Sequence, residues 1–321
     1  MPVGESDKGF GAEKGTLYYG IQSHFTYIDW WHDILPGSQE DFDHEGRMVS
    51  GIFTPNLTIG LSNYINISFS QTIGFRHLIW DGNQSSVHHR TEGTSKSRFN
   101  AIGGLLGDHK VMIRYLVSNA GKGSGSRVFL GGGFSLPSKN TLISDPFFLT
   151  DKNKMEEHRH FSMSDGCYKL IGETQFYLKR KLNPVFVGGA FLVQAPLEEN
   201  RYGYRSSTLY DLSLTAITNE HGFLKRSLNF NLGLMHTTHG YWNGIAAPNS
   251  RATVFTFGAG VLRNTDFGVV TVGLLKPVFI YGGFSGTDSE VDSQVDAWRL
   301  NVGFRRLFDY VIPWLDPLKN L

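Results

Sequence analysis

The chain repeats one pattern, in which apolar residues alternate with small polar residues until turn-forming residues interrupt the run. Residues 65–70 read Ile-Asn-Ile-Ser-Phe-Ser, and residues 210–216, 228–234 and 298–304 alternate in a similar way. A period of two places large apolar groups on one face of a β-strand and Asn, Ser or Arg on the other. Helical periodicity is nearly absent, so the pattern predicts a chain built from β-strands.

The expected strands are long enough to cross a membrane, because a tilted strand needs about 9–11 residues to span the hydrocarbon. Five short turns alternate with six long polar segments, and this asymmetry is typical of outer-membrane barrels with both termini on the periplasmic side. We therefore predict an all-β fold, a transmembrane antiparallel up-and-down β-barrel of about twelve strands. The expected strands cover residues 17–31, 47–60, 65–80, 99–118, 127–136, 165–180, 184–195, 207–218, 226–238, 251–263, 267–281 and 295–308.

This arrangement divides the chain into a periplasmic lead (1–16), one barrel (17–309) and a periplasmic tail (310–321). Gly103–Asp108 interrupts the strand expected at 99–118, which predicts a bulge or an inward kink there. A soluble sandwich would also alternate, but aromatic residues near the strand ends favour an interfacial girdle. These aromatics are Tyr18, Tyr19, Trp30, Trp31, Trp80, Tyr202, Tyr204, Tyr241, Trp242, Tyr281 and Trp298.

Composition agrees with a membrane barrel and argues against a nucleic-acid partner. The 321 residues include 38 glycines, 18% charged residues and a net charge of +1, without the basic excess of nucleic-acid binders. The single cysteine, Cys167, cannot form an internal disulfide, and no apolar run reaches the ~18 residues of a membrane-spanning helix. Because residues 1–8 are polar and do not form a signal peptide, we expect the chain to begin at or near the mature N-terminus of an exported, outer-membrane protein.

If the apolar positions face lipid, the intervening positions line the lumen. The charged lumen-lining residues are then Arg76, Lys110, Arg114, Lys169, Glu173, Lys179, Asp211, Arg299 and Arg305, accompanied by the amides Gln175, Asn229, Asn231 and Asn301. Basic groups outnumber acids, so a wet lumen would favour anions; alternatively, the cations pair with Glu173 and Asp211 and brace the wall. Segments 185–193 and 267–275 are apolar on both faces, which suits either the passage of an apolar solute or packing against an inward segment.

Chemical motifs are weak. His160-Phe161-Ser162 places a histidine and a serine on one strand face, as in an outer-membrane phospholipase, but no matching Asn context follows. His88, His89, His158 and His160 are weak candidates for a metal site, and solvated polar loops explain them better. We therefore expect no catalytic residues, no metal site and no cofactor.

Three short segments resemble a family of outer-membrane channels linked to the meta-cleavage pathway of phenol degradation. They are Gly60–Ser68, Leu106-Gly107-Asp108 with Val111–Leu116, and Gly131–Ser138. That family is distantly similar to the long-chain fatty acid transporters, which carry a long N-terminal hatch; residues 1–16 are too short for one. The resemblance implies a barrel and passage of hydrophobic small molecules, and it transfers no substrate residue.

Three functions follow from these observations. The first is an outer-membrane channel or facilitator for small solutes of hydrophobic or anionic character, with membrane lipid and the solute as partners. The second is a scaffold barrel that anchors a protein partner through its extracellular loops or through the tail, where Ile312-Pro313-Trp314-Leu315-Asp316-Pro317 offers apolar groups between prolines. The third is an outer-membrane lipase.

Overall fold

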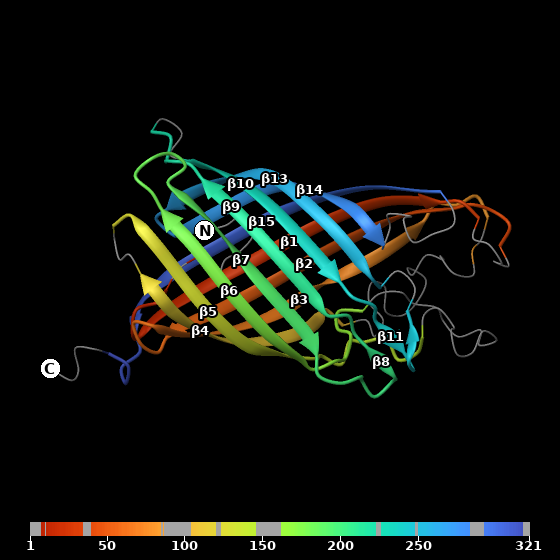
Figure 1. Ribbon diagram of the computed structural model, residues 1–321, viewed down its shortest axis with the longest axis horizontal. Coiled ribbons are helices and arrows are strands. Elements are labelled where there is room, and N and C mark those ends of the chain that lie inside the picture. The colour runs from red at the N-terminus through yellow and green to blue at the C-terminus, as the bar shows by residue number, and fades with distance from the viewer. Residues whose placement is uncertain are drawn as a thin grey trace.

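The computed structural model describes residues 8–9, 11–34, 40–84, 86, 104–119, 123–145, 162–222, 226–247, 250–282 and 292–316. Within this part of the chain, twelve strands form a closed antiparallel barrel in which β15 pairs with β1 (Figure 1). The barrel strands are β1 (Thr16–His32), β2 (His44–Gly60), β3 (Ile65–Trp80), β4 (Leu106–Asn119), β5 (Gly125–Leu136), β6 (Lys169–Lys179), β7 (Phe186–Pro196), β9 (Leu209–Ile217), β10 (Ser227–Thr237), β13 (Ala252–Thr265), β14 (Gly268–Gly282) and β15 (Ser293–Val311). The predicted fold class and strand number are confirmed.

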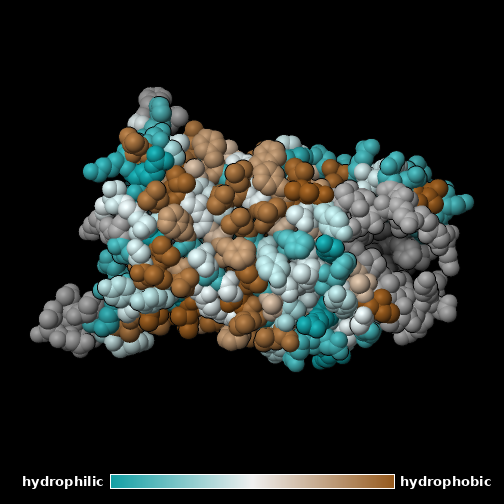
Figure 2. Space-filling model, in the orientation of Figure 1, coloured by the Kyte–Doolittle hydropathy of each residue, from teal (hydrophilic) through white to brown (hydrophobic). Residues whose placement is uncertain are grey.

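The alternation seen in the sequence becomes two faces of one closed wall. Cross-strand partners share a face, as in the row that joins Phe176 through Gly189 and Leu214 to Leu232. Its large side chains point away from the barrel and are about half exposed: Phe176 is 50% and Leu214 46% accessible. Figure 2 shows such apolar groups gathered over the middle of the wall, with hydrophilic groups toward both ends. A continuous apolar belt on a barrel without open edges fits a hydrocarbon environment.

No helix in the described part of the chain is long and apolar enough to cross a membrane.

Two strands, β4 and β6, begin more than two residues later than the sequence predicts. β4 begins at Leu106, and residues 99–103 of the predicted strand lie outside the described residues. At this level the register between β3 and β4 shifts between Gln71 and Ile73, and the Gln71 side-chain amide donates hydrogen bonds to the carbonyls of Thr72 and Gly107 (2.6 and 2.8 Å). β6 begins at Lys169 instead of residue 165, and residues 165–168 are not in a strand.

A small three-stranded sheet lies in segments that the sequence pattern assigns to loops. It consists of β8 (Tyr204–Arg205), β11 (Tyr241–Trp242) and β12 (Ile245–Ala246). β11 and β12 are joined by Asn243 and Gly244, both with positive φ (49° and 80°), as in a type I′ hairpin turn. Strands of two residues are too short to show alternation, so this Asn-Gly pair is the one sequence signal for them.

The segments next to the first and last strands meet at the end of the barrel that carries the short turns. Gly15 turns the chain into β1 with a φ of +81°, and a Cβ there would lie only 2.8 Å from Val311 Cγ1. The Gly15 amide donates to the Gly60 carbonyl (2.8 Å), and its carbonyl accepts from the Ile312 amide (3.0 Å). β15 continues to Val311, and the Trp314 side chain beyond it is 81% exposed.

Candidate functional site in the barrel lumen

The strand registers place all nine charged residues named from the sequence on the face opposite the apolar belt. For example, Arg305 pairs with Gly20 and Val269, Arg299 pairs with Thr26 and Leu275, and none of these shares the parity of the exposed apolar groups. Their surroundings differ along the barrel: Arg114, Lys169 and Glu173 are buried, Lys110, Asp211 and Arg299 are half-buried, and Lys179 is exposed at the strand end.

One buried ion pair joins two strands on the inward face, in the half of the barrel that carries the short turns. Arg114 on β4 donates from Nε to Glu173 Oε2 on β6 at 2.6 Å, although β5 lies between the two strands. Gly131 makes this possible, because a Cβ at that position would lie 3.2 Å from Glu173 Oε2 and 3.3 Å from Arg114 Cγ. The Arg114–Glu173 pair is one instance of the bracing role considered for the charged lumen residues.

The N-terminal lead reaches this network from inside the barrel. The Gly9 amide donates to Gln175 Oε1 at 3.1 Å, and the Gln175 side-chain amide donates to Glu173 Oε2 at 3.0 Å. Arg305 Nη1 donates to the Lys8 carbonyl at 3.3 Å. The described residues of the lead are therefore held against inward-facing groups of β6 and β15.

An apolar cluster packs beside the same segment. Leu116, Phe129 and Tyr177 are at most 5% exposed, and the Tyr177 ring stacks on Phe186 with a centroid distance of 5.0 Å. The positions where Gly11 and Gly9 would carry a Cβ are about 3.5 Å from Leu116 and from Phe186, respectively. Two glycines thus let the lead backbone lie in van der Waals contact with an apolar wall.

The middle of the lumen is polar. His24 Nδ1 lies 2.8 Å from Asn301 Oδ1, and the Thr215 hydroxyl donates to Asn229 Oδ1 at 3.0 Å. Small residues on β7, β9, β10 and β13 form one inward-facing row of cross-strand partners. The row consists of Ala190, Ser213, Gly233 and Thr256.

At the end of the barrel that carries the long connections, two inward-facing cations contact residues 162–165. Arg76 Nη1 donates to the Ser162 carbonyl at 3.1 Å, and Lys169 Nζ lies 2.5 Å from Asp165 Oδ2. The Ser162 hydroxyl donates to the Ser164 carbonyl at 2.6 Å, while His160 lies outside the described residues. The described residues therefore give no support to a His–Ser nucleophile.

No group of three or more His, Cys, Asp or Glu side chains that could hold a metal occurs in the part of the chain that the structure describes. The weak metal candidates His88, His89, His158 and His160 all lie outside it.

A second inward apolar cluster lies in the half of the barrel that carries the long connections. Ile28, Trp30, Leu78 and Ala297 form its core, and Trp80 packs against it. The expectation that Trp30 and Trp80 belong to an outward girdle is therefore wrong: their cross-strand partner Gly46 lies on the inward face, and Trp30 is only 5% exposed. Alternation alone does not distinguish a girdle from an inward ring when tryptophan occurs on both parities, as with Trp30 and Trp31.

The apolar belt, the closed hydrogen-bond ladder and the polar and charged groups on the inward face define a transmembrane β-barrel of the outer-membrane type. No protein-family model matches the chain, and no curated protein matches it.

Among solved structures, an outer-membrane channel from Pseudomonas putida F1 is similar over 95% of this chain and 100% of that chain, with a TM-score of 0.59 and 12% identity. The transport unit of the autotransporter AIDA-I from Escherichia coli covers 94% and 93% of the two chains (TM-score 0.44, 8% identity). A TodX monoaromatic hydrocarbon channel covers 92% and 91% (TM-score 0.40, 9% identity). The first of these likenesses supports the barrel fold.

Proposed function

We propose that this chain is an outer-membrane channel for small hydrophobic or amphipathic solutes, occluded in this structure by its own N-terminal lead. The observation that carries the proposal is an inward-facing apolar cluster of Leu116, Phe129, Tyr177 and Phe186. The N-terminal lead packs against this cluster and forms two hydrogen bonds with the wall of the lumen. Apolar groups inside a barrel serve an apolar occupant, because burying each of them from water contributes about 1.5–3 kcal/mol.

The lumen offers apolar surface at both ends. The extracellular cluster around Trp30 and the periplasmic cluster around Phe129 are separated by the polar middle level with His24 and Asn301. An amphipathic solute finds partners at all three levels. The solved outer-membrane channel that shares this fold agrees with such a role.

The test is uptake of 1-N-phenylnaphthylamine, a hydrophobic probe that fluoresces once it has passed an intact outer membrane. Cells that produce the barrel should take up the probe faster than cells without it. Ser213→Trp places a bulky ring in the inward row of small residues and should reduce uptake, whereas Leu214→Trp, the next residue on the opposite face, should not. Release of a periplasmic enzyme must stay equal in all strains. Equal uptake with and without the barrel would refute the proposal.

One observation favours the scaffold as a second candidate. Trp314 follows the last strand and is 81% exposed, as an apolar anchor for a protein partner would be. If the barrel is a scaffold, Trp314→Ala should abolish co-purification of a periplasmic protein and leave probe uptake unchanged. If the barrel is a channel without this partner, no periplasmic protein should co-purify with it, and producing the barrel should raise probe uptake.

A further inference from the structure

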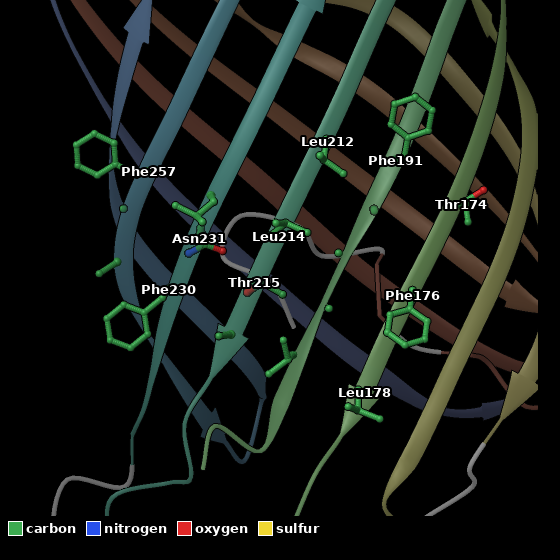
Figure 3. Close-up of a pocket in the computed structure, with 18 residues that line it drawn as sticks. Thr174, Phe176, Leu178, Phe191, Leu212, Leu214, Thr215, Phe230, Asn231 and Phe257 are labelled. Carbon is green, nitrogen blue, oxygen red and sulfur yellow. The ribbon is translucent and has the colours of Figure 1, made fainter. Parts of the chain in front are cut away.

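The outer wall of the barrel contains a groove of about 1030 Å³ formed by β6, β7, β9, β10 and β13. Phe176 and Phe191 flank it on one side and Phe230 and Phe257 on the other, with Leu212 and Leu214 between them (Figure 3). The small residues Gly189, Ala216 and Ala259 also line the groove. Specific ligand pockets have volumes of about 300–1,000 Å³, so the groove is large enough for a long apolar chain.

The groove lies on the lipid-facing side of the wall. Its four phenylalanines share the parity of the exposed belt, with Phe230 at 50% and Phe257 at 45% exposure. Among the described residues, no charged side chain lines it. The wall behind it is continuous, because β7, β9, β10 and β13 remain hydrogen-bonded along this stretch. An occupant therefore comes from the bilayer.

Two arginines stand at the periplasmic end of the same outward face. Arg226 immediately precedes the Ser227–Leu262 pair of β10 and β13, and Arg263 immediately follows it, so the two lie on adjacent strands at the same level. Ser227 and Leu262 are buried, whereas both arginines are exposed, as alternation requires. From Phe230 to Arg226 the strand covers about 13 Å, at ~3.3 Å per residue.

Neither arginine forms an ion pair with a carboxylate in the part of the chain that the structure describes. The exposed acids of the neighbouring turns, Glu220 and Asp266, are not bonded to them. Like charges on adjacent strands repel each other, so the arrangement favours an anion placed between them. At this depth of a bilayer the available anion is a lipid phosphate, to which arginine donates paired hydrogen bonds.

We propose that this face binds one glycerophospholipid of the periplasmic leaflet, with an acyl chain in the phenylalanine-lined groove and its phosphate on Arg226 and Arg263. The site lies outside the lumen and does not depend on the proposed transport function. Each arginine near a lipid headgroup adds electrostatic attraction, so removing both lowers affinity for an anionic lipid about 10- to 30-fold.

The test is native mass spectrometry of the detergent-purified barrel titrated with palmitoyl-oleoyl phosphatidylglycerol. The wild type should retain one lipid through detergent removal. The double substitution Arg226→Gln and Arg263→Gln should weaken binding by the stated factor, and Ala259→Phe, which fills the groove from an exposed position, should also weaken it. Two matched controls should bind as the wild type does: Arg306→Gln, an exposed arginine on the outward parity of β15, and Val302→Phe on the same strand.

Three results would overturn the proposal. The first is equal lipid retention by all five proteins, which would mean nonspecific annular lipid. The second is loss of binding in the Arg306→Gln control to the same extent as in the double variant, which would mean that net charge alone matters. The third is a dimer that Ala259→Phe dissociates, which would mean that a second copy of the chain occupies the groove. Heat-modifiability on gels verifies that each variant is folded.

Discussion

The buried pair between Arg114 and Glu173 makes the sharpest prediction about what holds the lumen wall together. Both residues are 5% exposed, their bonded atoms are 2.6 Å apart, and they meet across the glycine at position 131. Arg114→Met leaves the carboxylate buried without its cation, and Glu173→Gln leaves the guanidinium without its anion. Breaking one partner of a buried pair typically costs about 3–5 kcal/mol, so each single substitution should lower the free energy of unfolding by that amount.

The double substitution should cost less than either single one. When Arg114→Met and Glu173→Gln are combined, no unpaired charge remains, and the amide that replaces the carboxylate still offers an oxygen to the Gln175 side chain, whose hydrogen bond to Glu173 is 3.0 Å long. A neutral buried pair of similar volume is often as stable as the ionic one, and we expect a residual cost of about 1 kcal/mol. The difference between this cost and the sum of the single costs is the coupling energy of the pair.

Equilibrium urea unfolding in lipid vesicles, followed by tryptophan fluorescence, measures all three variants on one scale. Lys179→Met is the matched control, because Lys179 lies on the same face of β6 but is exposed; it should change the free energy by less than about 0.5 kcal/mol. The reasoning is refuted if the single substitutions each cost under about 1 kcal/mol or if the double substitution equals their sum. Either result would mean that water screens the pair and that the wall does not depend on it.

Three further predictions concern the lead, the ion selectivity and the cysteine. Gln175→Leu removes the 3.1 Å hydrogen bond from Gly9, worth about 1 kcal/mol, and single-channel recordings should show openings about fivefold more often; unchanged opening would mean that this bond does not hold the lead. Arg299→Ala should reduce an anion preference measured as a reversal potential in a salt gradient, and a cation-selective wild type would contradict the electrostatic argument. Burial raises the pKa of the Cys167 thiol, so less of it is thiolate at pH 7, and a maleimide should label the folded barrel at least ~10-fold more slowly than the urea-unfolded chain; equal rates would contradict burial.

Strand length and the asymmetry of the connections predict the barrel, and alternation divides its residues between two faces. A closed wall has only two faces, so once Phe230 and Leu232 are assigned to lipid, Asn229 and Asn231 must face inward. The same rule cannot give the partners. Arg114 and Glu173 are 59 residues apart, and their contact depends on strand register and on a missing Cβ at Gly131, neither of which is visible in a pattern of period two.

For a related reason, the sequence does not show which tryptophan side chains face inward and which face the lipid. Trp30 and Trp31 are adjacent, so one must face inward whatever the register. The interfacial preference of tryptophan favours counting both as a girdle. In the structure Trp30 faces inward and packs in the buried cluster with Ile28, Leu78 and Ala297.

The position of the lead follows from apolar contacts with the lumen wall, and no pattern in the sequence indicates these contacts. Residues 8–15 show no periodicity. A segment of this length cannot fill the whole lumen, but it can cover part of the lumen wall. Phe129 and Tyr177 are at most 1% exposed beside it, and leaving such rings in water costs about 1.5–3 kcal/mol each. Because Gly9 and Gly11 have no side chain, the backbone of the lead can approach these rings closely. If the barrel conducts apolar solutes, as we propose, a solute that covers the same rings competes with the lead for them, because the attraction between the lead and this wall is mainly apolar.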